Sequence, residues 1–334
     1  MARGQANLMD VADHVVGTCT GAKPGERALV LADETADAEL VGCLGAALRR
    51  RGLWAAMLTV PRIPPAPHGY LTWGEPDTLT GSVLLQHELV IVVMSTLICL
   101  SGAVKAARGQ GTRLLFIPAD YDLASCPMLH EDLDALAGLG RAVVRRLAGA
   151  RRLEVTSPDG TRLSLGALSA LGFDDARLLG PGELDFFPGG MWNGIPDPVT
   201  VEGVVRFNAS LYPLGRLREA VEVHFERGRI VRVAGGWEAR AWERWLHAQG
   251  DAGIFDFSHF SGGLSATTRT VGHDWEDLIV RGGLLISGGE NVLYGGGNAA
   301  RAHFDGVVRG ATLTVDGEEL LADGVYRLGE EGGM

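Results

Sequence analysis

The chain has 334 residues, of which 46% are hydrophobic, and a formal net charge of −11. This length predicts about two domains of roughly 100–200 residues each. The acidic balance argues against nucleic acid or an anionic membrane surface as the main partner. The longest apolar run, residues 89–100, is shorter than the ~20 residues of a spanning helix, so no membrane partner is expected. Residues 1–8 lack an apolar signal core, and the four cysteines lack CxxC spacing, which predicts a cytoplasmic protein with free thiols.

The first 150 residues alternate between short apolar runs and helical patterns. Strands are expected over residues 28–33, 54–60, 89–94 and 113–118, and helices over residues 1–20, 35–51, 104–108 and 131–150. Continuous apolar runs bounded by turns are typical of strands that are buried on both faces. The alternation predicts an α/β fold with an N-terminal domain, residues 1–150, built on a doubly wound parallel sheet. Neither GxGxxG nor GxxxxGK[ST] occurs, which argues against a dinucleotide or nucleoside triphosphate site.

Residues 151–334 have a different pattern. Residues 152–165 are expected to form a hairpin around an Asp-Gly turn, and strands are expected over 201–212 and 220–233. A Pro/Gly loop is expected over 186–194, an amphipathic helix over 237–249, and strands with glycine turns over 253–325. These features predict a C-terminal, β-rich α+β domain, residues 151–334, which would carry the metal site described next.

A histidine and an aspartate stand two residues apart at the start of an expected strand near the C-terminus. Side chains at positions i and i+2 of a strand share a face, so His303 and Asp305 project side by side, with Phe304 opposite. They are two ligands of a candidate metal site, and His259 is the candidate third. Two histidines and a carboxylate form the facial triad of non-haem iron(II) enzymes, which leaves positions for substrate and dioxygen.

Spacing alone leaves other interpretations of these residues open. His303 could be a hydrogen-bonded core histidine, with Asp305 at a strand end, because the HxD pattern is common by chance. Residues 273–277 form a second acidic cluster, which is a rival site or a solvated loop.

Several segments resemble the thermophilic metallo-aminopeptidase superfamily. They are Lys23–Asp33, Asp159–Thr161, Val201–Gly203, Phe225–Ile230, Gly235–Gly236 and His303–Asp305. The resemblance spans most of the chain, and its last motif is the chemically specific one. The superfamily includes two-metal peptidases and also 2,5-dihydroxypyridine 5,6-dioxygenases, which carry one iron on two histidines and an aspartate.

Two departures from the peptidase pattern favour the dioxygenase branch. Pro198 and His259 stand where the peptidases carry glutamate ligands. A site that lacks both carboxylates would not hold two dications. The resemblance instead implies His259, His303 and Asp305 as the ligands of Fe(II), or of another divalent metal.

A third departure concerns proton transfer. The resemblance implies a proton-handling histidine just after the third strand, yet residues 95–101 contain none. Thr96 and Ser101 are the candidate catalytic residues in this stretch. Either hydroxyl could hold a substrate group, but both would be poor bases near neutral pH. The substrate therefore differs from that of the dioxygenases, or this chemistry has been lost.

Three functions follow as hypotheses. The first is a mononuclear non-haem Fe(II) dioxygenase of the ring-opening, extradiol-like type, acting with O2 on a small hydroxylated aromatic or heteroaromatic compound in a cleft between the domains. The second is a catalytically altered aminopeptidase-like protein that binds a peptide in a peptide-modification or natural-product pathway. The third is a one-zinc hydrolase. The resemblance also implies a homo-oligomer.

The first hypothesis assigns roles to residues around the triad. Aromatic side chains that could stack on a substrate ring are Phe257, Phe260, Phe304 and Tyr294. Candidate hydrogen-bonding partners of the ligands are Ser261, Ser287 and Asn298.

Overall fold

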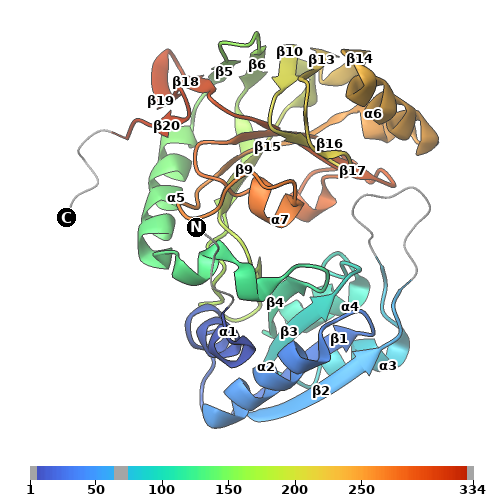
Figure 1. Cartoon of the computed structure of the whole chain (residues 1–334), viewed down its shortest axis with the longest axis vertical. Coiled ribbons are helices and arrows are strands. Elements are labelled where there is room, and N and C mark those ends of the chain that lie inside the picture. Colours follow the sequence, from blue (N-terminus) through green and yellow to red (C-terminus); the bar gives the residue numbers. More distant parts are fainter. Residues whose placement is uncertain (1–5, 64–73, 329–334) are drawn as a thin grey trace. The chain divides into compact units, whose positions relative to one another are not determined.

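The computed structural model describes residues 6–63 and 74–328 (Figure 1). The chain forms two compact units, one within residues 6–63, 74–130 and 175–189 and the other within residues 131–174 and 190–328. Residues 131–150 thus group with the second unit although they precede the expected boundary, and residues 175–189 group with the first. Whether residues 1–150 and 151–334 act as separate domains stays a prediction.

The first unit is built on a five-stranded parallel sheet in the order β2-β1-β3-β4-β8. Its strands are β1 (Arg27–Asp33), β2 (Trp54–Val60), β3 (Leu89–Met94), β4 (Arg113–Pro118) and β8 (Leu184–Phe186). Every residue of β3 and β4 is buried. Full burial explains why these runs are continuously apolar rather than alternating, and the predicted α/β fold is confirmed.

Helices accompany the strands of the parallel sheet. They are α1 (Leu8–His14), which continues as a π-helical turn over Val15–Cys19, α2 (Ala38–Arg50), α3 (Thr78–Leu84) and α4 (Gly102–Gly109). The side chains of Asp37, Asp77 and Ser101 cap the amino ends of α2, α3 and α4. The chain crosses from β1 to β2 toward one edge of the sheet, and from β3 to β4 toward the other edge. Because both crossovers are right-handed, α2 and α4 lie on opposite faces of the sheet.

A buried aspartate ends β1, at the point where the strand order reverses between β1 and β3. One carboxylate oxygen of Asp33 accepts hydrogen bonds from the backbone N–H and hydroxyl of Thr35, at 2.9 and 2.5 Å. The other accepts from the N–H and hydroxyl of Ser95, both at 2.7 Å. Burial opposes ionisation, but these donors hold the pKa of Asp33 below its usual value. Protein groups therefore satisfy this carboxylate completely.

The second unit contains two antiparallel sheets. The eight-stranded sheet has the order β14-β13-β10-β6-β5-β18-β19-β20, and the seven-stranded sheet has the order β12-β11-β17-β16-β15-β9-β7. The strands of the first are β5 (Arg152–Thr156), β6 (Arg162–Gly166), β10 (Glu202–Phe207), β13 (Val221–Glu226), β14 (Arg229–Ala234), β18 (Thr312–Val315), β19 (Glu318–Ala322) and β20 (Val325–Tyr326). Those of the second are β7 (Leu168–Phe173), β9 (Met191–Pro196), β11 (Ser210–Leu211), β12 (Gly215–Arg216), β15 (Phe257–Gly263), β16 (Leu284–Gly289) and β17 (His303–Val308). Helices α5 (Leu133–Leu147), α6 (Trp237–Ala248) and α7 (Asp274–Asp277) complete the unit.

Aromatic side chains fill the core between these two sheets. Phe225 of β13 packs edge-on against Phe257 of β15, with ring centroids 5.5 Å apart. Trp242 of α6 contacts Phe207 of β10 and, at 4.8 Å, Phe304 of β17. These contacts hold one face of β15 and β17 in the core, which leaves their other face for polar side chains.

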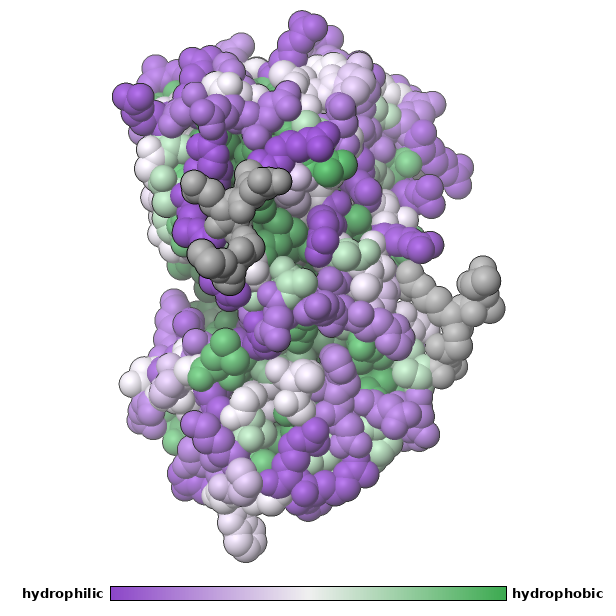
Figure 2. Space-filling view, turned by 90° about the vertical axis from the view of Figure 1, so that its left-hand side faces the viewer, coloured by the Kyte–Doolittle hydropathy of each residue, from purple (hydrophilic) through white to green (hydrophobic). Residues whose placement is uncertain are grey.

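The prediction of a loop over residues 186–194 is wrong in part. It contains the end of β8 and most of β9, whose glycine and proline content hides the strand pattern. The four cysteines all lie in the described part of the chain and form no disulfide, which confirms the prediction of thiols. No helix in the described part of the chain is long and apolar enough to cross a membrane. On the face shown in Figure 2, hydrophilic residues predominate and hydrophobic residues form separate patches.

Candidate metal centre

Three neighbouring strands of the seven-stranded sheet bring the candidate ligands together. His303 and Asp305 lie on β17, His259 lies on β15, and β16 runs between the two. On β16, Ser287 is directly opposite Asp305, and Gly289 is opposite His303. The regular pairing of β16 with β17 keeps Ser287, His303 and Asp305 on one face, as the two-residue period of a strand requires.

A β-bulge brings His259 to the same face. Phe257 pairs with Gly288 but Phe260 pairs with Ile286, so β15 uses one more residue than β16 over this interval. The extra residue lets Phe257 and Phe260 both stay in the core, three positions apart, while His259 faces the polar side. Bulges often redirect a side chain next to a functional site in this way.

The side-chain atoms of the three residues converge in a buried space. His259 Nε2 lies 3.3 Å from His303 Nε2 and 3.6 Å from an Asp305 carboxylate oxygen. His303 Nε2 lies 3.3 Å from the other oxygen of Asp305. The exposed fractions are 0% for His259, 2% for His303 and 4% for Asp305. Among the described residues, this is the one group of three or more His, Cys, Asp or Glu side chains whose donor atoms meet.

Hydrogen bonds on the far side of each ligand fix its orientation. His303 Nδ1 lies 2.7 Å from the Glu290 carbonyl, which can only accept, so this nitrogen carries a proton and donates it. Nδ1 of His259 lies 2.6 Å from the Ser261 hydroxyl, and the Ser287 hydroxyl donates to Asp305 at 2.5 Å. The Glu290 carbonyl also accepts from the Ser258 hydroxyl at 2.8 Å. Such outer partners orient metal-binding histidines and carboxylates.

Burial and mutual charge shift the pKa values of all three groups. Burial lowers the pKa of His259 to about 3 despite the nearby Asp305 carboxylate. Burial also disfavours the imidazolium of His303, but Asp305 and the Glu290 carbonyl raise the pKa of His303 above its usual value. Burial opposes ionisation of Asp305, yet His303, His259 and Ser287 hold its pKa to about 2. One positive charge, on His303 beside the Asp305 carboxylate, is therefore favoured, whereas a second one on His259 is disfavoured.

The donor set fits one divalent metal. With Nδ1 of His303 protonated, its Nε2 presents a lone pair toward those of His259 and Asp305. Three ligands each ~2.0–2.2 Å from one ion stand roughly 3 Å apart, close to the spacings of 3.3 to 3.6 Å found here. Two imidazoles and one carboxylate are ligands that suit Fe(II), Zn(II) and similar ions.

Tyr294 is the aromatic residue next to the cluster. Its ring centroid lies 4.0 Å from that of His259 and 6.5 Å from that of His303. It ends a 3₁₀ turn, Val292–Tyr294, whose first N–H groups are capped by the Glu290 carboxylate. The loop is closed at its base by backbone and side-chain hydrogen bonds between Asn291 and Asn298. Tyr294 is therefore held on a closed loop beside the ligands.

The other aromatic residues expected at the site are core residues. Phe257, Phe260 and Phe304 are fully buried on the opposite face, in contact with Phe225, Trp192 and Trp242 respectively. Asn298 lies in the Tyr294 loop, where its amide donates to the carbonyls of Gly253 and Gly289. Sequence reasoning missed the Glu290 carbonyl, because a backbone acceptor leaves no residue-type signal.

Thr96 and Ser101, the two expected catalytic hydroxyls, lie in the first unit. The Thr96 hydroxyl donates to the carbonyl of Ile63 at 2.9 Å. The Ser101 hydroxyl accepts from the N–H of Val104 at 3.1 Å as the cap of α4. Both are buried and both have structural hydrogen bonds, and their catalytic role stays a prediction.

The rival acidic cluster at residues 273–277 has a structural arrangement. The Asp277 carboxylate accepts from the backbone N–H groups of Val271 and Gly272 and from the hydroxyl of Tyr212, at 2.8 Å. His273 pairs with its neighbour Asp274. These contacts order the turn before α7 rather than gathering three ligands.

Comparison with known proteins shows to which family the chain belongs. A curated relative, the 2,5-dihydroxypyridine 5,6-dioxygenase of Pseudomonas putida KT2440, is 24% identical over 266 residues, or 74% of each chain. The solved structure of the 2,5-dihydroxypyridine dioxygenase from the same organism shares the fold, with a TM-score of 0.79, 20% identity, and coverage of 99% of this chain and 100% of that one. Wild-type AmpT from Thermus thermophilus also shares the fold, with a TM-score of 0.66, 15% identity, and coverage of 96% and 98%. The family model described as NicX, 2,5-dihydroxypyridine 5,6-dioxygenase, matches residues 7–327, so the chain belongs to this dioxygenase family, the branch that the sequence had suggested.

Proposed function

We propose that the protein is a mononuclear Fe(II) dioxygenase that opens the ring of a small hydroxylated aromatic or heteroaromatic compound. The observation that carries the proposal is the convergence of His259, His303 and Asp305 in a chain of a dioxygenase family. The 2,5-dihydroxypyridine named for the relatives is the first substrate to test. When bound, the metal would supply open coordination positions at which substrate and dioxygen meet.

The chain's own residues supply orientation and exclusion of water. The Glu290 carbonyl and Ser261 hold the two imidazoles so that both Nε2 atoms face the metal position. Ser287 holds the carboxylate from the neighbouring strand. Burial of all three ligands keeps bulk water away, which strengthens electrostatic interactions within the site.

Tyr294 forms one wall of the substrate position in this proposal. Its ring lies over His259, so a planar substrate on the open side of the ligands would contact an aromatic surface. Its loop is anchored by Asn291 and Asn298, which favours a fixed wall over one that closes on binding.

The test combines metal analysis with substrate turnover. The protein is purified without oxygen, stripped of metal, and reconstituted in parallel with Fe(II), Mn(II) or Zn(II). Dihydroxypyridines and catechols are then added with oxygen. We expect Fe(II) to bind and the ring absorbance to fall in step with dioxygen consumption. Hydrolysis that depends on Zn(II), or peptide binding that ignores metal removal, would instead support the hydrolase or the peptide-binding hypothesis.

A matched pair of variants links the result to the triad. His303→Ala removes a ligand, whereas His224→Ala removes a strand histidine that also pairs with a carboxylate two residues away, Glu222, but is half-buried and outside the cluster. Metal and turnover should disappear in the first variant and persist in the second. Equal metal content in His303→Ala and the unmodified protein would sink the proposal.

A further inference from the structure

Glu290 lies directly after strand β16, where the loop that carries Tyr294 begins. Its carbonyl accepts hydrogen bonds from Nδ1 of His303 at 2.7 Å and from the Ser258 hydroxyl at 2.8 Å. His303 lies on β17, and Ser258 lies on β15 directly before the other ligand histidine. A single backbone carbonyl therefore ties both ligand strands to the start of this loop.

The residue that would normally cap the turn of Tyr294 is engaged elsewhere. The first N–H groups of a 3₁₀ turn, here Val292–Tyr294, have no partner inside the turn. Asn291 precedes the turn, at the position from which a side chain usually caps such groups, but makes no capping bond. Its amide instead donates to the Ser258 carbonyl at 3.3 Å and accepts from the N–H of Asn298 at 2.8 Å. The cap is therefore left to another side chain.

The carboxylate of Glu290 supplies this cap. One of its oxygens accepts from the N–H of Val292 at 2.5 Å and from the N–H of Leu293 at 3.3 Å. Glu290 is only 5% exposed, and a buried carboxylate is costly unless strong hydrogen bonds compensate it. Bonds from backbone N–H groups to a carboxylate are of this strong kind. Because a turn of three residues has little stability of its own, the carboxylate decides where the turn lies.

The position of this turn fixes the position of the Tyr294 ring. The N–H of Tyr294 donates to the Asn291 carbonyl at 3.1 Å, and the ring centroid lies 4.0 Å from that of His259. Gly295 follows with a φ of +90°, which ends the turn directly after the tyrosine. The side chain of Glu290 therefore acts on the aromatic wall through the turn, whereas its carbonyl acts on a metal ligand.

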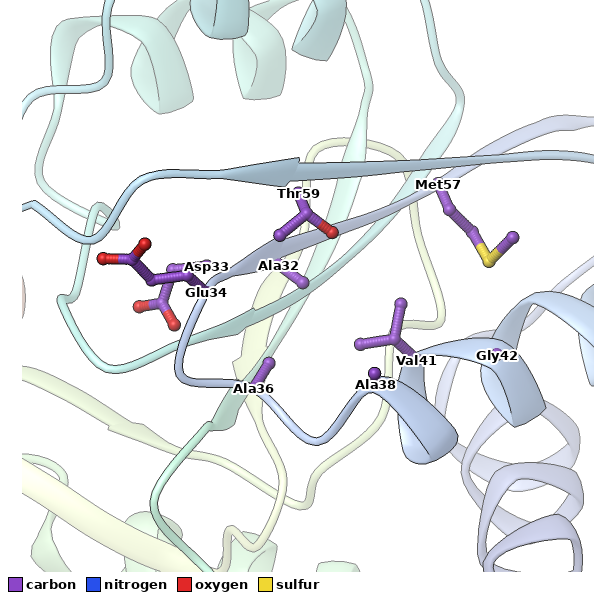
Figure 3. A pocket seen from close by; sticks show the side chains of 9 residues that line it. All are labelled: Ala32, Asp33, Glu34, Ala36, Ala38, Val41, Gly42, Met57 and Thr59. Carbon is purple, nitrogen blue, oxygen red and sulfur yellow. The ribbon is translucent and has the colours of Figure 1, made fainter.

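A hollow in the first unit offers a ring neither an aromatic wall nor a metal ligand of this kind. It has a volume of about 350 Å³ and is lined by side chains of β1, β2 and α2, among them Glu34, Met57 and Thr59 (Figure 3). Among the described residues that line it, none is aromatic and none is a histidine. The carboxylate of Asp33, which also lines it, is already satisfied by hydrogen bonds. Ring recognition is therefore assigned to the Tyr294 loop.

We propose that Glu290 is a positioning residue that makes the site selective for planar rings, because its carboxylate holds the Tyr294 ring beside the metal position. This proposal rests on the proposed function, in which Tyr294 is one wall of the substrate position. A planar ring bound at the metal contacts this wall, whereas a small aliphatic metal ligand does not. Loss of the carboxylate therefore weakens the binding of rings, while the backbone carbonyl continues to orient His303.

The test measures, by calorimetry without oxygen, how the metal-reconstituted protein binds two probes. 2,5-Dihydroxypyridine presents a planar ring, whereas glycolate presents two oxygens to a metal and no ring. We expect Glu290→Ala to raise the Kd of the ring by about 2–10-fold, the value of one aromatic contact. The Kd of glycolate, and the metal affinity measured by chelator competition, should not change.

Two further substitutions at the same position separate reach from charge. Glu290→Gln should restore ring binding, because its amide oxygen still accepts from both N–H groups of the turn. Glu290→Asp keeps the charge but has a shorter side chain, and it should weaken ring binding as Glu290→Ala does. The aspartate variant also tests the proposal if the alanine variant fails to fold.

Two comparisons show whether Glu290 acts through Tyr294. Tyr294→Ala should weaken ring binding, and adding Glu290→Ala should weaken it no further, since the wall is already lost. Glu131→Ala is the matched control. This buried carboxylate also accepts from two consecutive N–H groups, those of Ala266 and Thr267, but on a different loop. Both Kd values should stay unchanged in the control.

The possible outcomes distinguish this proposal from the proposed function. An unchanged ring Kd in Glu290→Ala, an equal loss for glycolate, or a further loss in the double variant would overturn this proposal alone. So would normal ring binding in Tyr294→Ala. An unmodified protein that binds no metal or no ring would overturn the proposed function, and this proposal with it.

Discussion

Two buried aspartates, one in each unit, show how similar residues acquire different roles. Asp33 ends a strand of the parallel sheet and is surrounded by donors, the N–H and hydroxyl groups of Thr35 and Ser95. Asp305 lies on an antiparallel strand and receives one hydroxyl, from Ser287, while its inner side faces two imidazoles. The first carboxylate is satisfied by the protein. The second, Asp305, needs a proton or, as proposed, a metal ion between it and the two imidazoles.

The difference teaches that burial alone does not mark a functional carboxylate. Both aspartates are nearly inaccessible to solvent, and both have a lowered pKa. What separates them is the identity of the neighbours. A carboxylate surrounded by hydrogen-bond donors needs no further partner. Where the lone pairs of several acceptors converge, they leave a position that only a cation can stabilise.

The largest expected effect comes from removing Asp305, the carboxylate whose inner side faces the two imidazoles. Asp305→Asn should reduce bound metal from one equivalent to background, because one of three ligands is lost. Asp33→Asn should keep its metal, because Asp33 has no place in the cluster. Metal analysis after reconstitution measures both. Equal metal in the two variants would remove the distinction drawn between these aspartates.

A smaller loss of metal affinity is expected when Asp305 is kept and only its orientation is disturbed. Ser287→Ala removes the hydroxyl that holds this carboxylate from β16 and should weaken metal binding by about 10–100-fold. Ser169→Ala, on β7 of the same sheet, removes a hydroxyl that donates to the Ile195 carbonyl and serves as the control. Competition with a chelator of known affinity measures the difference. Equal affinity in the two variants would show that Ser287 does not position the ligand.

Asp33→Asn should instead lower the free energy of unfolding. The amide cannot accept all four hydrogen bonds and turns a donor toward the N–H groups of Thr35 or Ser95. Leaving buried donors unpaired costs about 1–3 kcal/mol. Urea unfolding near neutral pH, compared with the unmodified protein, measures the cost. No change in the midpoint would contradict the view that Asp33 organises this end of the sheet.

The smallest expected effect is the pH dependence of the stability that Asp33 contributes. Because the pKa of Asp33 is lowered on folding, its contribution is present above the ordinary value of 3.8 and is lost as pH falls through the folded value. The stabilities of the unmodified protein and Asp33→Asn should therefore converge below about pH 4. Urea midpoints measured at several acidic pH values test this, and a constant gap would rule it out.

Sequence patterns predicted the regular parts of the fold and site. The buried strands β1, β3 and β4 are continuous apolar runs, and the two-residue period was enough to place His303 and Asp305 on one face. Strand β8 was missed because three residues carry no period, and β9 because its glycines and prolines are typical of loops.

The position of His259 could not follow from periodicity. A regular strand would place Phe257 and His259 on the same face, yet one lies in the core and the other in the cluster. His259 was assigned through a family resemblance, and the physical reason for its placement is visible only in the pairing of β15 with β16. The partners Ser261 and Ser287 were named from composition, but only the strand register shows what each one contacts.

The bulge in β15 also constrains how such a centre can arise. Substituting histidine into an otherwise regular strand would not reproduce this arrangement, because without the additional residue either the imidazole or the core phenylalanine faces the wrong way. A one-residue insertion has to accompany the substitution. Transplanting the centre to another scaffold, or tracing its origin among relatives, therefore requires counting backbone residues as well as comparing side chains.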